Sequence, residues 1–181
     1  NYFLLCASIF FYAWGEPEFV IIMLGVILFN YLMAIFISKW LRMKKPLLIT
    51  AICGNLSVLF IFKYLNFTVN NINGLFGTGI ELPTVVLPIG ISFFTFQAMS
   101  YVIDVYRGDV RLQTNPFHLG LYVSFFPQLV AGPIVRYQTI EEQIRKRTIT
   151  GKNFCCGLER FVVGLFKKMI ISNNVAIVVD F

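Results

Sequence analysis

The sequence predicts an all-α protein that crosses a membrane several times, and three observations lead to this expectation. Hydrophobic residues make up 57% of the chain and charged residues only 13%, whereas soluble domains are about 45–50% apolar and about 25% charged. Aromatic residues reach 17%, which suits lipid contact and interfacial belts. Several apolar runs approach the roughly 20 residues that a helix needs to cross a bilayer. We therefore interpret residues 1–181 as one integral-membrane domain.

The first half of the chain contains three apolar runs separated by polar turns. Phe3–Trp14 is an oily segment, and Phe19–Ser38 is long enough to span a bilayer. The aromatic and basic stretch 39–45 that follows is typical of a cytoplasmic interface. Leu47–Leu65 is expected to cross back, with Lys63 near its end, where the long side chain can reach the headgroups.

The next crossing carries an unusual number of polar side chains. Asn66–Thr84 is polar, rich in Asn and Gly and free of basic clusters, so we expect it on the outer side. Ile89–Val105 then crosses the membrane. One helix face of this segment gathers small, polar and charged residues at spacings of three and four, namely Gly90, Phe93, Gln97, Ser100, Asp104 and Arg107. Close helix packing explains the small residues, whereas a buried Gln97 needs hydrogen-bond partners, and Asp104 with Arg107 fits a structural ion pair.

The stretch 117–137 is the most informative part of the chain. It is oily, yet prolines, a glycine, an amide and a guanidinium interrupt it, at Pro127, Gln128, Gly132, Pro133 and Arg136. A free backbone group in hydrocarbon costs several kcal/mol, so broken backbone is tolerated there only inside protein or beside a water-filled path. We interpret this stretch as the wall of a cavity. A packed re-entrant turn in which Arg136 caps a helix fits the same residues equally well.

Two further helices are predicted after this break. Thr139 to Glu142 has the pattern of a capping box, with Thr139 as the N-cap, and the residues after it favour a short helix on the cytoplasmic surface. Phe154–Ser172 is a final helix. It contains charged side chains that are costly in lipid, so we expect it to be tilted, or to face the protein interior or the inner interface.

The charges and cysteines exclude several function classes. The net charge is +6, but the basic residues lie in short clusters beside apolar runs, as the positive-inside rule describes, and do not form a continuous stripe for nucleic acid. The four cysteines lie in or beside apolar runs without metal-ligand spacing. We therefore expect contact with membrane lipids, no nucleic-acid partner and no metal site.

Several segments match a known family. They are 87–97 (LPIGISFFTFQ), 104–108 (DVYRG), 125–137 (FFPQLVAGPIVRY), 157–161 (GLERF) and 164–168 (GLFKK), together with 11–14 (FYAW). In this order they resemble the membrane-bound O-acyltransferase superfamily (MBOAT), in particular the bacterial branch of alginate O-acetyltransferases and the D-alanyl transfer protein of teichoic acid. The resemblance extends over essentially the whole chain.

The resemblance implies both a fold and an activity. The expected fold is part of a ring of tilted helices around a thin centre, with a funnel on each face. The expected enzyme is an O-acyltransferase in a bacterial inner membrane. It would move an acyl group, acetyl above all, from a cytoplasmic acyl-CoA or acyl-carrier thioester to hydroxyls of an extracytoplasmic polysaccharide. It would bind no further cofactor and would work with periplasmic or extracellular acyl-transfer proteins.

The family's catalytic histidine is expected in a later helix, beyond Phe181. We therefore expect the chain to be the N-terminal portion of a longer polypeptide, and we assign no catalytic residue within it. The one histidine, His118, precedes the break and is interpreted as an interfacial side chain.

From the residues themselves we expect a substrate path along the break. Its residues are Gln97, Pro127, Gln128, Gly132, Pro133 and Arg136. D-alanyl transfer to teichoic acid is the close alternative to acetyl transfer. A transporter or channel, or a non-catalytic membrane scaffold, is the alternative from a different class; the sequence shows no internal repeat that would favour a transporter.

Overall fold

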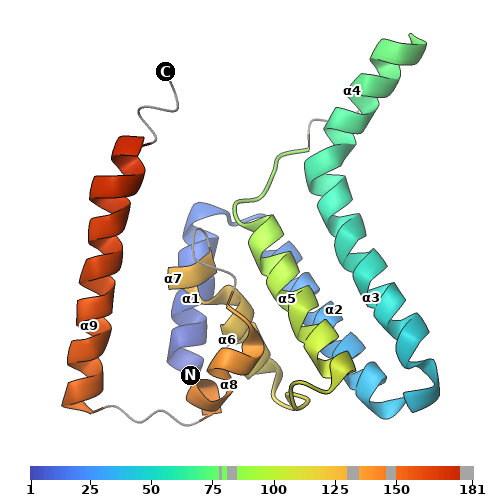
Figure 1. Ribbon diagram of the computed structural model, residues 1–181. Coiled ribbons are helices and arrows are strands. Elements are labelled where there is room, and N and C mark those ends of the chain that lie inside the picture. Colours follow the sequence, from blue (N-terminus) through green and yellow to red (C-terminus); the bar gives the residue numbers. More distant parts are fainter. Residues whose placement is uncertain (78, 81–84, 130–134, 146–149, 176–181) are drawn as a thin grey trace. The chain divides into compact units, whose positions relative to one another are not determined.

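The computed structural model describes residues 1–77, 79–80, 85–129, 135–145 and 150–175. Every regular element in this part of the chain is a helix, which confirms the all-α prediction (Figure 1). The chain packs as two compact units, Asn1–Ile144 and Arg145–Phe181, and each is described here by itself. The expectation of a single membrane domain stays a prediction.

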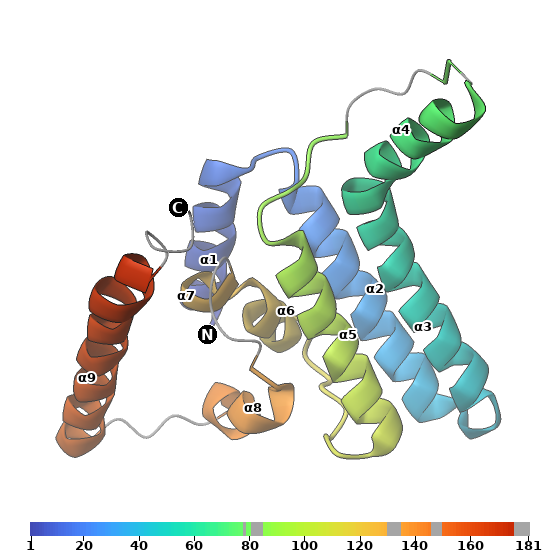
Figure 2. The same ribbon diagram turned by 45° about the horizontal axis from the view of Figure 1, so that its top comes forward.

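Three helices form the centre of the first unit. They are α2 (Val20–Lys39), α3 (Lys44–Leu59) and α5 (Ile91–Arg107), and α5 packs against both of the others (Figures 1 and 2). Their contact surfaces contain small side chains that are fully buried, namely Ala34, Ala51 and Ala98. In a membrane the hydrophobic effect does not drive helices together, so association depends on close packing, which small residues permit. The predicted segments 19–38, 47–65 and 89–105 are thereby confirmed as helical.

Two helices are long and apolar enough to cross a membrane by length and composition, Val20–Lys39 and the continuous helix Leu41–Phe76. The longer one consists of a 3₁₀ turn (Leu41–Met43), α3, a π-helical turn (Phe60–Tyr64) and α4 (Leu65–Phe76). Helix α1 (Tyr2–Gly15) is apolar but shorter. A membrane protein is therefore supported by two candidate spans among the described residues.

Helix α4 begins where the sequence turns polar and has no buried residue. Its polar side chains bond back to helix carbonyls: Thr68 Oγ1 donates to Tyr64 O at 2.8 Å, and Asn71 Nδ2 donates to Phe67 O at 2.9 Å. Such bonds keep short polar residues compatible with a helix. The polar stretch that begins at Asn66 is therefore helical up to Phe76.

Two asparagines of α4 also hold the chain that returns toward α5. Asn66 Nδ2 donates to Val85 O at 3.0 Å while its Oδ1 accepts from Val85 N at 3.4 Å. Asn73 bonds Ile80 in the same way, at 2.9 and 3.0 Å. The two asparagines lie seven residues apart and thus on one helix face, so together they hold Ile80 and Val85 against α4.

Three short helices follow α5. They are α6 (Pro116–Ser124), α7 (Phe126–Leu129) and α8 (Tyr137–Arg145). Asn115 caps α6, because its Oδ1 accepts from Phe117 N at 2.9 Å and Pro116 occupies the first helical position. Helix α8 confirms the predicted short helix, but it begins at Tyr137. Thr139 therefore lies in its first turn instead of serving as the N-cap.

In the second unit, the described residues 150–175 form a helix with a π-helical turn. Helix α9 (Gly151–Phe166) is capped by Thr150, whose Oγ1 accepts from Asn153 N at 3.3 Å, and continues as the turn Lys167–Ser172. This confirms the predicted helix at 154–172. Its described side chains are all exposed within the chain.

Candidate functional site

The backbone is interrupted immediately after α6. Helix α6 ends at Ser124, Phe125 takes a non-helical ψ of 109°, and α7 is only four residues long. Pro127 is tolerated in α7 because the N–H groups of a first helical turn have no partner within the helix. Of the residues expected along a substrate path, Gly132 and Pro133 lie outside the described residues.

The chain before residue 130 is held against the start of α5. Gly90 has a φ of +77°, a left-handed backbone conformation that residues other than glycine rarely adopt. A Cβ at this position would lie 3.0 Å from the carbonyl oxygen of Leu129. Glycine is therefore required here for two reasons, the backbone turn that begins α5 and the close approach of the last residue of α7.

The chain after residue 134 is held by a buried tyrosine. Tyr122 Oη donates to Val135 O at 2.7 Å. The backbone carbonyl of Tyr122 in turn accepts from Gln97 Nε2, also at 2.7 Å. Gln97 is 3% exposed, so the amide predicted to need partners finds one on α6. The flanks of segment 130–134 are thus fixed by α5 and α6.

Three buried tyrosines pack together below this point, and the sequence analysis missed them. The Tyr137 ring lies 5.0 Å from that of Tyr101 and 5.1 Å from that of Tyr122, both edge to face. Gln113 joins two of them, since its Nε2 donates to Tyr137 Oη at 2.6 Å and its backbone N donates to Tyr101 Oη at 2.9 Å. A buried phenol needs a hydrogen-bond partner. Tyrosines within apolar runs that also contain polar residues could therefore have indicated this cluster from the sequence.

Four buried polar side-chain atoms of the first unit have no hydrogen-bond partner among the described residues. They are Thr95 Oγ1, Asp104 Oδ2, Ser124 Oγ and Gln128 Nε2. A buried polar atom without a partner costs about 1–3 kcal/mol. Ser124 ends α6 and Gln128 lies in α7, so two of the four belong to the break itself.

The remaining predicted residues take different positions. Gln128 is half-buried, whereas Pro127 and Arg136 are exposed. Asp104 is buried and Arg107 is exposed. No ion pair joins Asp104 and Arg107, both of which the structure describes, so the expected pair is not formed. Arg136 and Arg107 still act electrostatically on Asp104 from a greater distance.

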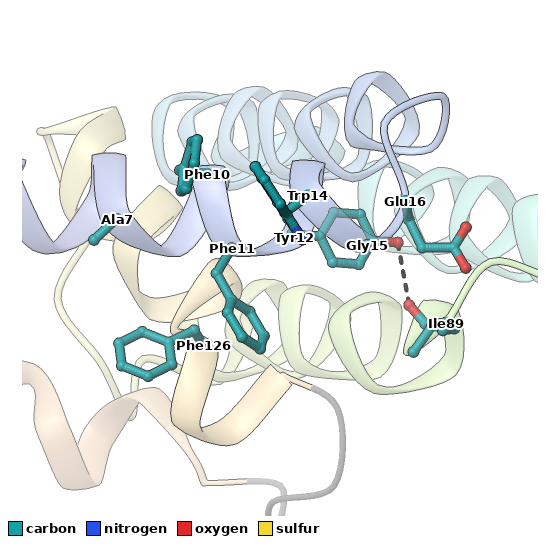
Figure 3. Close-up of a pocket in the computed structure, with 9 residues that line it drawn as sticks. All are labelled: Ala7, Phe10, Phe11, Tyr12, Trp14, Gly15, Glu16, Ile89 and Phe126. Carbon is teal, nitrogen blue, oxygen red and sulfur yellow. Dashed lines mark hydrogen bonds between the residues drawn. The ribbon is translucent and has the colours of Figure 1, made fainter.

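A hollow of about 650 Å³ lies beside the break (Figure 3). Its walls come from the second half of α1, from Ile89 and from Phe126, and the rings of Phe11 and Phe126 pack with centroids 5.5 Å apart. The hydroxyl of Tyr12 is occupied, because its Oη donates to Ile89 O at 3.1 Å. Glu16 is the charged residue among those that line the hollow. Because the walls are aromatic and aliphatic, this hollow suits an apolar group better than a sugar or an ion.

The described part of the chain was expected to contain no metal centre, and its histidine and cysteines are not among the residues that line the hollow beside the break. No group of His, Cys, Asp and Glu there could hold a metal ion. His118 lies near the start of α6, with its Nε2 3.4 Å from Asn1 Nδ2. The four cysteines are free and exposed.

Comparison with curated proteins gives relatives over almost the whole chain. It is 39% identical over 187 residues to the probable alginate O-acetylase AlgI of Pseudomonas syringae pv. tomato, covering 99% of this chain and 36% of that protein. It is 38% identical to the probable alginate O-acetylase AlgI of Pseudomonas aeruginosa, with the same two shares. A peptidoglycan O-acetyltransferase of Helicobacter pylori is 34% identical over 207 residues, covering 98% of this chain and 39% of that protein.

No protein-family model and no solved structure matches the chain. The chain spans little more than a third of the length of the curated relatives. Within that share the similarity is continuous, and it confirms the resemblance carried by the motifs. Along nearly its full length the chain is homologous to part of the bacterial alginate O-acetylases and of a peptidoglycan O-acetyltransferase, in agreement with the membrane-bound O-acyltransferase family.

Proposed function

We propose that the whole protein is a membrane O-acyltransferase that transfers an acetyl group to hydroxyls of a polysaccharide outside the cytoplasm. The observation that carries this proposal is the similarity, over 99% of the chain, to proteins named for O-acetylation. We further propose a multi-pass protein of a bacterial inner membrane, with these helices forming part of a ring. Periplasmic or extracellular acyl-transfer proteins would be its partners. The two long apolar helices support the membrane setting.

The proposed reaction begins from a cytoplasmic acyl-CoA or acyl-carrier thioester. The acceptor hydroxyl oxygen attacks the thioester carbonyl carbon, the carbon–sulfur bond breaks, and the thiol leaves with the proton. Such a transfer needs a base for the hydroxyl proton and hydrogen-bond donors for the negative charge that develops on the carbonyl oxygen. We assign the base to no residue of this chain.

We propose that the break supplies donors and walls for the donor thioester. Gln128 Nε2 is buried without a partner among the described residues, and Arg136 is an exposed guanidinium at the other flank of segment 130–134. Both can donate to a carbonyl or a thioester carrier. Gln97 has its amide engaged with α6, so we propose that it positions the break and does not itself touch the substrate.

The test is acyl transfer by the complete protein in liposomes. Acetyl thioester is enclosed, polysaccharide is added outside, and ester formed on the polysaccharide is measured. We expect ester in the wild type and at least a tenfold loss in Gln128→Ala and in Arg136→Ala, since removing one oxyanion donor elsewhere costs about 10²–10³ in rate. The exposed Gln138→Ala and Arg111→Ala are matched controls that retain activity.

The outcomes separate the alternatives. A D-alanyl thioester that replaces acetyl as the better donor would favour transfer to teichoic acid. Solute flux without a new ester bond would favour a transporter, and neither flux nor ester would favour a scaffold. Wild-type ester yields in well-folded Gln128→Ala and Arg136→Ala would leave the activity in place but remove these two residues from the path.

A further inference from the structure

Two further hollows lie on helix α3 and the π-helical turn Phe60–Tyr64. One hollow, of about 400 Å³, lies between this helix and the start of α5 and is lined by Lys63, Tyr64 and Ser92 together with apolar side chains. The other, of about 480 Å³, lies on the same helix and is lined by residues from Cys53 to Ile61. Leu56 and Phe60 line both hollows, so they form a ridge between them.

One end of the ridge carries a cation without a carboxylate partner. Lys63 is exposed, and its Nζ lies 5.6 Å from the ring centroid of Tyr64. No acidic side chain among the described residues pairs with it. Tyr64 and Ser92 place two hydroxyl-bearing side chains in the same lining. An ammonium with neighbouring hydroxyls is a chemistry that binds phosphate.

The rest of the lining is apolar and belongs to a candidate membrane span. The helix Leu41–Phe76 is long and apolar enough to cross a bilayer, and only 17% of its most apolar window is buried within the chain. Leu56 and Phe60 are 47% and 46% exposed. Beyond Tyr64 the helix becomes rich in asparagine, which puts Lys63 and Tyr64 where interface anchors occur in membrane helices.

We propose that this surface is a binding site for one diacyl anionic phospholipid. The phosphate of the headgroup binds Lys63 with help from the Tyr64 and Ser92 hydroxyls, and the two acyl chains lie in the two hollows on either side of the Leu56–Phe60 ridge. Charge and shape together favour this ligand: the cation requires an anion, and paired apolar hollows on a bilayer-facing helix fit two chains. π-Helical turns are rare and occur frequently at functional sites.

The test uses the complete protein reconstituted into phosphatidylcholine vesicles that contain a minority of phosphatidylglycerol. The protein is extracted gently, and retained phosphatidylglycerol is measured by native mass spectrometry. We expect Lys63→Gln to retain about fivefold less of this lipid, the effect of one basic residue near an anionic surface. Lys39→Gln is the matched control, because Lys39 is also an exposed lysine beside an exposed aromatic residue, Trp40, at the end of an apolar helix.

A second variant tests the hollows independently of charge. Leu56→Trp fills the ridge region and should expel the lipid while Lys63 stays in place; Ile49→Trp, at an exposed position on the same helix outside both hollows, should not. Equal retention by Lys63→Gln and wild type, equal loss in Lys39→Gln, or full retention in Leu56→Trp would each overturn the proposal. Displacement of the lipid by glycerol 3-phosphate would instead identify a free-phosphate site. Wild-type protein without bound phosphatidylglycerol would show that another part of the protein fills the hollows.

Discussion

The contact between α2 and α3 and the break after α6 both bury polar side chains, but they treat them differently. Asn30 and Asn55 are fully buried and bond to each other reciprocally, each Nδ2 donating to the other's Oδ1 at 2.8 Å. Each amide also donates to a carbonyl four residues earlier in its own helix, Val26 O and Ala51 O. At the break, by contrast, Gln128 Nε2 has no partner among the described residues.

This difference in hydrogen bonding indicates which buried amides stabilise the fold and which can bind a ligand. A polar pair that satisfies itself fastens two helices and has no donor left for a ligand, because both N–H bonds of each amide are used. A buried amide without a partner is costly, so we expect Gln128 to be bonded by a group outside the described residues, and we propose that this group is the substrate. We therefore look for substrate contacts at the break and for stability at the Asn30–Asn55 pair.

The largest effect is expected at Gly90, where the backbone of α5 meets the break after α6. Gly90→Ala should destabilise the protein by about 2 kcal/mol, because the left-handed φ is strained for alanine and the new Cβ would lie 3.0 Å from Leu129 O. Acyl transfer should fall with it, since Leu129 borders the break. Thermal unfolding of the purified protein and ester yield measure the two effects.

Gly25→Ala is the control for this experiment. Gly25 lies inside α2, and an added Cβ there has no atom within 4 Å. Alanine favours a helix interior by up to about 1 kcal/mol over glycine, so stability should stay level or rise. A Gly90→Ala protein as stable and active as Gly25→Ala would show that the α5–α7 contact is not required.

The Asn30–Asn55 pair between α2 and α3 should respond in a different way. Asn55→Leu leaves the Asn30 amide buried without its partner and should cost about 1.5 kcal/mol of stability. The double variant Asn30→Leu/Asn55→Leu should recover part of that loss, because no polar group is then left unpaired. Unfolding in increasing denaturant measures the stability of the double variant and of both single variants, Asn55→Leu and Asn30→Leu. A double variant whose loss of stability equals the sum of the two single losses would contradict the reciprocal pair.

Much of the helical framework follows from local sequence. The apolar runs at 19–38, 47–65 and 89–105 correspond to α2, α3 with its π-helical turn, and α5, because a stretch of that length and composition has few alternatives. The helical character of α4 was harder to foresee. Its asparagines are poor helix formers, and two of them are compensated by bonds to Ile80 and Val85, far along the chain.

In the candidate site, too, some features follow from local sequence and others depend on contacts between helices. The prolines and the glycine within 127–133 predicted an interrupted backbone, since proline disrupts a helix interior, and the interruption is observed at Phe125. The contacts that hold its flanks, Gln97 to Tyr122 and Tyr122 to Val135, depend on how α5 and α6 are rotated toward each other. Sequence spacing places Gln97 on a face but gives no information about the opposing helix. The predicted ion pair of Asp104 with Arg107 was wrong for the same reason. Helix packing buries Asp104 and leaves Arg107 exposed, and sequence spacing does not reveal this packing.

The smallest effect is expected from a single hydroxyl at the flank of the break. Tyr122→Phe removes the 2.7 Å bond to Val135 O and should lower stability by only about 1 kcal/mol. Its effect on acyl transfer should be larger than that loss of stability alone explains, because the bond fixes one flank of the break. Tyr31→Phe is the control: it removes a bond of the same length, from half-buried Tyr31 of α2 to Thr114 O, which is not a flank of the break. Equal ester yields from the two variants at equal amounts of folded protein would mean that Tyr122 stabilises the fold without shaping the path.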